Sequence, residues 1–385
     1  MEQEAAGVFY EIKQKKELLL KQGKQVYDMS IGTPDFLPVQ DIIETITKAC
    51  EKPENYKYAV TDLPELQDAL IGHYKRRFGV MITRDEMTSI NGTQEGMAHI
   101  FLALCNPEDT VLIPNPGYPI FEDGAAFAKA EIYKYPLLEE NHFLPDLKGL
   151  PIEVVRRAKV MVVSYPLNPV GMTAPDSFYE QLIAFAKENE IIIIHDNAYS
   201  DIIFGGRRGK SFLAFKGAKE IGMEFFSLSK SYNLTGARIS FAVGNREIIT
   251  QFKKLRSRID YGMFLPLQYG AISALEGEQQ ELLTQCQHYE ERSRRLCQGF
   301  RDLGWQVPDS QGSMFVWCRV PKHFHDGEAF CKELLERAGV ICTPGNYFGT
   351  LGAKYVRFAL VIKIEEIENM LQAIKESGIL NKDNK

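Results

Sequence analysis

The segment from Ser227 to Arg238, SLSKSYNLTGAR, places an amine close to a permanent cation at the end of an apolar, strand-like stretch. Lys230 follows at the expected turn, among small hydroxyl side chains. A neighbouring cation lowers the basicity of a lysine, whose neutral amine forms a Schiff base with an aldehyde. The guanidinium fork of Arg238 suits a phosphate. An aldehyde and a phosphate on one ring indicate pyridoxal 5′-phosphate. The alternative is a polar surface turn.

A carboxylate follows four consecutive isoleucines in the stretch IIIIHDNAY, where it needs a basic partner. A pyridinium nitrogen is such a partner for Asp196, which would keep the ring protonated. Tyr199 and Asn168 are candidates to donate hydrogen bonds to a ring oxygen. His195 alternates to the other face of the strand, which favours a core histidine over a catalyst. The alternative for Asp196 is a cap on the next turn.

The motif NGTQEG, from Asn91 to Gly96, follows another strand-like run and opens a helix. Backbone amides of Thr93 and Gln94 at this helix start are placed to bind a phosphate. An ordinary helix cap is the alternative reading of this motif.

Strand-like runs alternate with helical ones through the middle of the chain, which predicts an α/β fold with a mostly parallel, doubly wound sheet. The predicted strands begin near Met87, Thr110, Ala130, Lys159, Glu190, Glu224 and Ile239. Between them, a capping box of Ser177 and Glu180 predicts a helix that runs to Lys187.

The pattern of residue types changes after about residue 275, where it predicts long charged helices and two further strands, SMFVWCRV and YVRFALV. This predicts a smaller α+β domain. The first forty or so residues also lack the α/β rhythm and are expected to pack with it. The expected division is therefore a large domain at 45–275 and a small one at 1–44 with 276–385.

The composition limits the partners and the compartment. Over 385 residues the formal net charge is −6, which argues against nucleic acid or an anionic membrane as the main partner. The start of the chain lacks the apolar core of a signal peptide, and no apolar run reaches membrane-spanning length. Seven scattered cysteines without a CxxC pair indicate reduced thiols and no metal site. We expect a cytoplasmic protein.

Nine short motifs now converge on one family. They are, in chain order, IGTPDF, KYAV with PELQDAL, NGTQEG, NPGYP, LNPVG, DNAY, SLSKSYNLTGAR, TPGNYFG and YVRFAL. Together they resemble the class I/II aminotransferases, which are fold-type I pyridoxal-phosphate enzymes. HDNAYSD and DYGMFLPLQYGAISAL are most similar to the branch with alanine, aspartate and LL-diaminopimelate aminotransferases.

The resemblance implies a role for each matching position. The catalytic residues would be Lys230, Asp196 and Tyr199. The cofactor would be bound by Thr93, Gln94, Tyr118, Asn168, Asp196, Tyr199, Ser227, Ser229, Lys230 and Arg238. The substrate α-carboxylate would be bound by Arg357, with Asn168 and Gly32. Tyr58 would reach the cofactor phosphate of the neighbouring subunit, which implies a homodimer with shared active sites.

The implied reaction moves an amino group between an L-amino acid and a 2-oxo acid by a ping-pong mechanism. A carbon–sulfur β-lyase is the alternative with the same cofactor contacts, and a non-catalytic regulatory protein that keeps the cofactor is a third reading. The chain departs from the common pattern at Asn197, at Ala237 and in a shorter segment after Tyr58 that lacks the usual glycine. These departures lie in pocket walls, so the resemblance does not carry a substrate with it.

Overall fold

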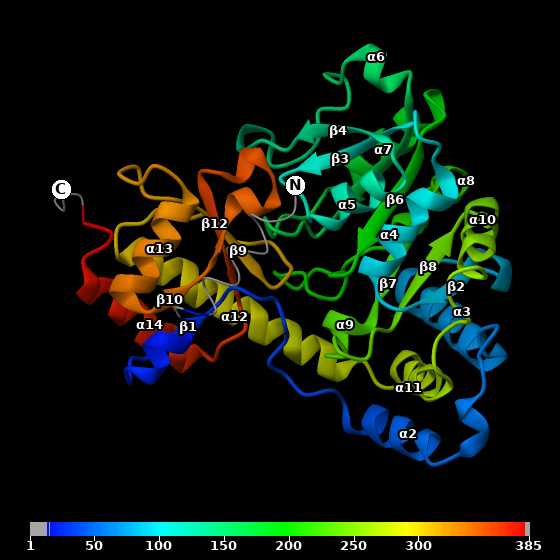
Figure 1. The fold of residues 1–385 in the computed structure, drawn as a ribbon, viewed down its shortest axis with the longest axis horizontal. Helices are drawn as coiled ribbons and strands as arrows, with labels where there is room; N and C mark the ends of the chain where they lie inside the picture. The colour runs from blue at the N-terminus through cyan, green and yellow to red at the C-terminus, as the bar shows by residue number, and fades with distance from the viewer. Residues whose placement is uncertain (1–13, 15, 382–385) are drawn as a thin grey trace.

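The computed structural model of the protein describes residue 14 and residues 16–381. Residues 1–13, in which the absence of a signal-peptide core was noted, lie outside the described residues. A large group of elements around a seven-stranded sheet stands beside a smaller group around two short sheets (Figure 1). Within the described part of the chain, no helix combines the length and the apolar character needed to cross a bilayer.

The large sheet has the strand order β2-β8-β7-β6-β5-β3-β4, and of these strands only β8 runs against the others. Its strands are β2 (Met87–Ile90), β3 (Thr110–Asn115), β4 (Glu131–Pro136), β5 (Ala158–Ser164), β6 (Ile192–Asn197), β7 (Gly222–Ser227) and β8 (Ser240–Gly244). The seven predicted strands and the mostly parallel sheet are therefore confirmed.

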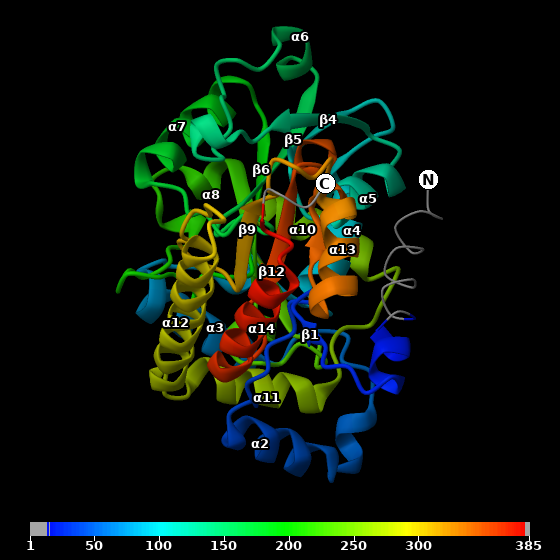
Figure 2. The same ribbon diagram turned by 90° about the vertical axis from the view of Figure 1, so that its left-hand side faces the viewer.

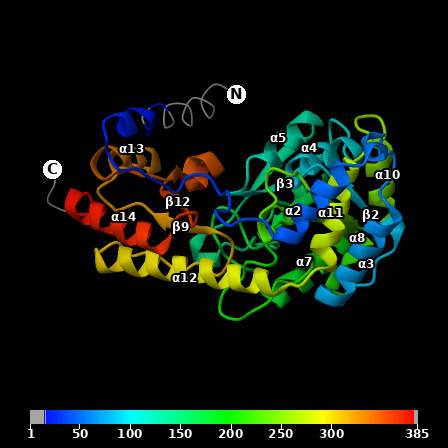
Figure 3. The same cartoon turned by 90° about the horizontal axis from the view of Figure 1, so that it is seen from below.

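Helices cover both faces of this sheet, which explains why β7 and β8 are buried along their whole length. One face carries α4 (Thr93–Leu104), α5 (Ile120–Phe127) and α10 (Arg246–Arg256). The other face carries α3 (Pro64–Phe78), α7 (Asp176–Glu188) and α8 (Ala218–Ile221). Outside them α2 (Gln40–Cys50) packs on α11 (Leu265–Glu276), and α6 (Ile152–Val155) and α9 (Leu228–Ser231) are single turns (Figure 3).

The start of α7 corrects the predicted capping box. The helix begins one residue earlier, at Asp176, and Ser177 lies inside its first turn. Pro175 occupies the N-cap position with a φ of −73°, and it has no side-chain oxygen that could accept a hydrogen bond from the first turn. Asp176 then supplies a negative charge to the first turn. The predicted apolar face is buried, as expected.

The smaller group joins both ends of the chain. Strand β1 (Tyr27–Asp28) pairs with β10 (Val340–Ile341), and β9 (Phe315–Arg319), β12 (Tyr355–Ala359) and β11 (Thr343–Pro344) form an antiparallel sheet. Its helices are α12 (Gln280–Asp302), α13 (Gly327–Ala338) and α14 (Ile364–Ser377). Figure 2 shows α14 between α12 and α13, both of which it contacts.

We propose a two-domain division close to the one expected from the sequence. Tyr27 and Met29 pack in the core of the smaller group, which supports the placement of the amino-terminal strand there. Ile42 of α2 packs instead in the core of the large sheet. We therefore place the division just before Gln40 rather than after residue 44.

Candidate active site

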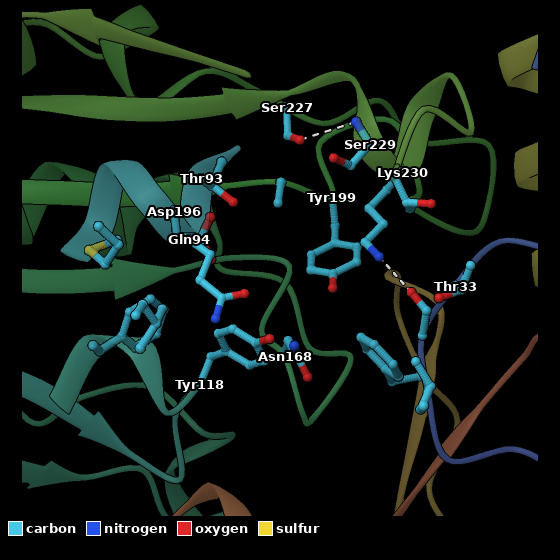
Figure 4. Close-up of a pocket in the computed structure, with 18 of the residues that line it drawn as sticks. Thr33, Thr93, Gln94, Tyr118, Asn168, Asp196, Tyr199, Ser227, Ser229 and Lys230 are labelled. Carbon is cyan, nitrogen blue, oxygen red and sulfur yellow. Dashed lines mark hydrogen bonds between the residues drawn. The ribbon is translucent and has the colours of Figure 1, made fainter. Parts of the chain in front are cut away.

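A cavity of about 450 Å³ opens at the carboxyl ends of the large sheet's strands, where the smaller group of elements meets it. Each residue predicted from the sequence to hold cofactor or substrate lines this cavity, except Tyr58. They are Gly32, Thr93, Gln94, Tyr118, Asn168, Asp196, Tyr199, Ser227, Ser229, Lys230, Arg238 and Arg357. The fold thus brings together residues from seven separate segments. Figure 4 shows how side chains on several of these segments, from Thr93 to Lys230, surround the cavity.

Lys230 lies on the single-turn helix α9 rather than at the plain turn that its sequence suggested. Ser227 ends β7 and caps this turn, because its Oγ accepts a hydrogen bond from the Ser229 N–H at 3.1 Å. The side chain of Gln285 on α12 donates to the Lys230 carbonyl at 2.9 Å. The lysine amine donates to the Gly32 carbonyl at 2.5 Å across the cavity (Figure 4). The two hydrogen bonds therefore fix Lys230 at its backbone carbonyl and at its amine.

The environment of Lys230 makes it a nucleophile near neutral pH. Burial, and then the charges of Arg357 and Arg238, lower the pKa of its amine to about 8. Each of these causes disfavours the ammonium form. A neutral lysine amine is the form that attacks an aldehyde and that accepts a proton from carbon.

Asp196 ends β6 with one carboxylate oxygen satisfied and the other free. Its Oδ2 accepts a hydrogen bond from Ser164 at 3.4 Å, and the backbone N–H of Ala198 also donates to the carboxylate. Within the part of the chain that the structure describes, the buried Oδ1 atom has no partner. Burial raises the pKa of Asp196 to about 6. A cationic or N–H donor would satisfy this oxygen.

The amino end of α4 forms an anion cradle beside Arg238. No side chain caps this helix, so its first N–H groups stay available. Gly92 precedes it with a φ of +95°, and a Cβ there would lie 2.0 Å from Nη2 of Arg238. Arg238 itself has a φ of +56°, a strained value for a residue with a side chain. Such strain is typical of functional sites, and here the guanidinium lies close to Gly92 at the helix end.

Arg357 of β12 is a buried cation at the opposite side of the cavity. Its guanidinium donates to Asn168 Oδ1 at 2.9 Å and to the Ser30 carbonyl at 2.7 Å. It lies between the rings of Phe315 and Phe348, whose centroids are 4.1 and 4.6 Å from Cζ. Among the described residues, Nε of Arg357 has no partner. Burial lowers the pKa of this guanidinium to about 10.

Two further predictions concern residues around the cavity. Tyr58 is 80% exposed and lies against Tyr261, with ring centroids 5.0 Å apart, so it is outside its own subunit's cavity. His195 is a core histidine as expected, because it is fully buried and its Nε2 lies 3.2 Å from the Tyr179 hydroxyl. Burial lowers the pKa of His195 to about 3.

The sequence did not single out four residues that shape this site. Gly92 belongs to the NGTQEG motif, and a glycine before a helix start is a signal for close backbone approach. Phe315 and Phe348 stack on Arg357, and Gln285 holds the Lys230 carbonyl. Nothing local marks these three, because each acts on a residue far away in the chain.

The side chains present fit pyridoxal 5′-phosphate. The free Oδ1 of Asp196 suits a protonated ring nitrogen, and the cradle at Gly92 and Arg238 suits the phosphate. Lys230 lies in the same cavity to receive the aldehyde.

Comparison with known proteins agrees with this site. Residues 24–374 match the family described as aminotransferase class I and II. The LL-diaminopimelate aminotransferase of Syntrophobacter fumaroxidans is 39% identical over 371 residues, which are 96% of this chain and 95% of that protein. The enzyme of the same name from Aquifex aeolicus is 38% identical over 370 residues, again 96% of this chain and 95% of that protein.

Solved structures share the fold over nearly the whole chain. Apo-BacF from Bacillus subtilis is similar with a TM-score of 0.92 and 35% identity, covering 98% of this chain and 95% of that one. A probable N-succinyldiaminopimelate aminotransferase from Thermus thermophilus has a TM-score of 0.90 and 32% identity, covering 96% of this chain and 100% of that one. The chain therefore belongs to the class I and II aminotransferases, fold-type I enzymes that use pyridoxal 5′-phosphate to move an amino group between an amino acid and a 2-oxo acid.

Proposed function

We propose that this aminotransferase works through Lys230 as catalytic base, Asp196 as partner of the cofactor ring and Arg357 as the clamp for the substrate α-carboxylate. The observation that carries this proposal is the placement of Lys230. Its amine, with a pKa near 8, lies in one cavity with Arg238 on the side of the α4 cradle and Arg357 on the other. A molecule with a phosphate and a carboxylate would therefore be held with its reacting atoms at the lysine.

The cofactor, when bound, supplies the aldehyde that takes up the amino group and the ring that stores electrons during the transfer. Lys230 Nζ would take the proton from the substrate α-carbon and deliver it to the cofactor carbon that carried the aldehyde. Asp196 keeps a proton on the ring nitrogen, and Tyr199 and Asn168 donate hydrogen bonds to the ring oxygen. Tyr118 covers the ring face.

The remaining residues hold the two anions. The phosphate would be bound by Thr93, Gln94, Ser227, Ser229 and Arg238. Arg357 has no carboxylate within salt-bridge distance among the described residues, and this unpaired buried charge favours a carboxylate ligand. Asn168 and the backbone of Gly32 complete that end of the cavity.

Both substrates of such a site occupy the same place one after the other, which gives ping-pong kinetics. The named relatives are aminotransferases, which favours transamination over the β-lyase alternative. Their names also make LL-diaminopimelate a donor to be tested here.

We further propose a homodimer in which Tyr58 completes the partner's site. Aromatic and apolar side chains are exposed on two adjoining segments: Tyr56 63%, Tyr58 80%, Val60 71% and Tyr261 58%. The segments are in contact through the Tyr58–Tyr261 and Tyr56–Phe264 ring pairs. An exposed apolar patch of this kind is typical of a protein interface. We also place the enzyme in the cytoplasm, which its seven free thiols support.

Chemical trapping tests the central assignment. Borohydride should fix the cofactor on the peptide that contains Lys230, and Lys230→Ala should still bind the cofactor but lose turnover almost completely. Lys253, a half-buried lysine outside the cavity, provides the control Lys253→Ala, which should be trapped and active like the parent. A label on any other lysine would overturn the proposal.

The cofactor spectrum separates the two chemistries. A transaminase given a donor and no acceptor stops after one half-reaction, with its cofactor converted to the amine form. A β-lyase given cystathionine instead releases ammonia over many turnovers. Sustained ammonia release, with no amine form from any donor, would contradict transamination.

A further inference from the structure

Each charged side chain that lines the cavity has a proposed partner in the cofactor or in the substrate. Among the described residues that line it, four are charged: Asp196, Lys230, Arg238 and Arg357. The proposed function uses Asp196 for the ring nitrogen, Lys230 for the transfer, Arg238 for the phosphate and Arg357 for the α-carboxylate. Among the described residues of this subunit, no lining cation is left for a second carboxylate.

Uncharged side chains form the wall beside the carboxylate clamp, and Ile31 and the Tyr347 ring give it an apolar part. Ile31 precedes Gly32, whose missing side chain leaves room for the Phe315 ring, since a Cβ there would lie 2.6 Å from Phe315 Cζ. Tyr347 precedes Phe348, the second ring that stacks on Arg357. Ile31 and Tyr347 both line the cavity, next to the groups that hold the clamp.

Ile31 is unusually exposed to solvent for an aliphatic side chain. It is 63% exposed although it lines the cavity. A substrate clamped by Arg357 would extend its side chain from the α-carbon within reach of this surface. An apolar substrate side chain would cover Ile31 and remove both surfaces from water, which is favourable.

We infer that the amino donor of this enzyme carries an uncharged, apolar or aromatic side chain, and that Ile31 is a specificity-determining residue for it. This inference rests on the proposed role of Arg357 as α-carboxylate clamp. A donor with an acidic side chain would place its second carboxylate against Ile31 and Tyr347, where no lining cation of the described residues is left to pair with it. Such a carboxylate would also gain none of the apolar contact that Ile31 offers.

A panel of donors tests the substrate class. Phenylalanine, leucine, alanine, glutamate, aspartate and LL-diaminopimelate would each be mixed with the purified holoenzyme without acceptor, and the rate of conversion of the cofactor to its amine form measured. We expect phenylalanine and leucine to exceed the three diacids in kcat/KM by about tenfold or more, because only the apolar side chains gain the contact with Ile31. A diacid that reacts faster than both would overturn the inference.

A pair of matched variants tests Ile31. Ile31→Ala should lower kcat/KM for leucine and phenylalanine about tenfold, because apolar contact equivalent to about two methylene groups is lost, and should change that for alanine less than twofold. Ile152 on α6 is similarly exposed, at 59%, and lies outside the cavity, so Ile152→Ala is the control. An equal loss for alanine and leucine in Ile31→Ala would show that the residue supports the fold and does not select the substrate.

Binding of unreactive analogues separates this inference from the proposed function. Hydrocinnamate and glutarate are the deaminated forms of phenylalanine and glutamate, and calorimetry on the holoenzyme gives their dissociation constants. We expect hydrocinnamate to bind at least tenfold more tightly, and tighter glutarate binding would refute the apolar pocket. If no donor in the panel converted the cofactor, the proposed function would fail, while the two analogues would still decide the nature of the pocket.

Discussion

The lowered pKa of Lys230 predicts how fast the enzyme without cofactor takes up pyridoxal 5′-phosphate at each pH. Only the neutral amine reacts with an aldehyde. With a pKa of about 8, instead of the ordinary 10.5, roughly a quarter of Lys230 is neutral at pH 7.5 rather than about one part in a thousand. The structure therefore predicts attachment roughly 200-fold faster at this pH than an ordinary lysine of equal reactivity would allow.

The direction of the pH dependence follows from what lowers the pKa of Lys230. Burial and the two arginines disfavour the ammonium form, so the rate should rise with pH, reach half its maximum near pH 8 and stay flat above about pH 9. Removing the charge of Arg357 with Arg357→Gln should move this midpoint upward. Arg357→Lys keeps the charge but loses the fork, so it should leave the midpoint close to 8.

Stopped-flow absorbance of the cofactor, after its complete removal from the protein, measures the attachment rate from pH 6 to pH 11. Nα-acetyl-lysine provides the reference amine under the same conditions. Borohydride trapping at each pH would confirm that Lys230 is the residue labelled. A midpoint at or above pH 10, or the same midpoint in Arg357→Gln as in the parent, would refute the electrostatic reasoning.

Three other substitutions test the remaining parts of the site. Asp196→Asn should reduce turnover by orders of magnitude. It should also raise the melting temperature of the cofactor-free protein at pH 7.5, because burial raises the pKa of this carboxyl. Its ionisation lowers the free energy of unfolding by up to about 3 kcal/mol above pH 6 and by nothing below pH 4. A lower melting temperature would count against a strained carboxylate. Tyr58→Phe should weaken cofactor retention by one phosphate hydrogen bond, about 1.5 to 3 kcal/mol, while sedimentation still shows a dimer; a fully active monomer would exclude the shared site. Gly92→Ala should weaken cofactor binding at least about tenfold by displacing Arg238, whereas Gly79→Ala, with a similar φ of +69° and open space around it, should only strain the backbone. Equal cofactor affinity in these two variants would argue against the cradle.

The sequence alone determined where the strands of the large sheet lie along the chain and the chemistry at single strand ends. Apolar runs of strand length showed where the chain is buried on both faces, and the alternation with helices predicted a mostly parallel sheet. Lys230 and Arg238 lie on one short segment, so their types and spacing were enough to indicate an aldehyde and a phosphate. The resemblance then added Arg357 and Tyr58, which no local pattern marks.

Only the tertiary structure decided how these groups act on one another. The pKa of Lys230 depends on burial and on Arg357, which is 127 positions away in the sequence, counted from 230 to 357. The rings of Phe315 and Phe348, which stack on Arg357, come from two segments of the smaller group. Gly92 has no side chain and so leaves room for the guanidinium of Arg238, which belongs to a distant segment of the chain. The predicted capping box at Ser177 was wrong because the helix begins at Asp176, which places Ser177 inside the first turn and Pro175 at the N-cap. Local periodicity reports that a residue is buried, but desolvation and charge pairing depend on which distant surface covers it, and only the folded chain determines that surface.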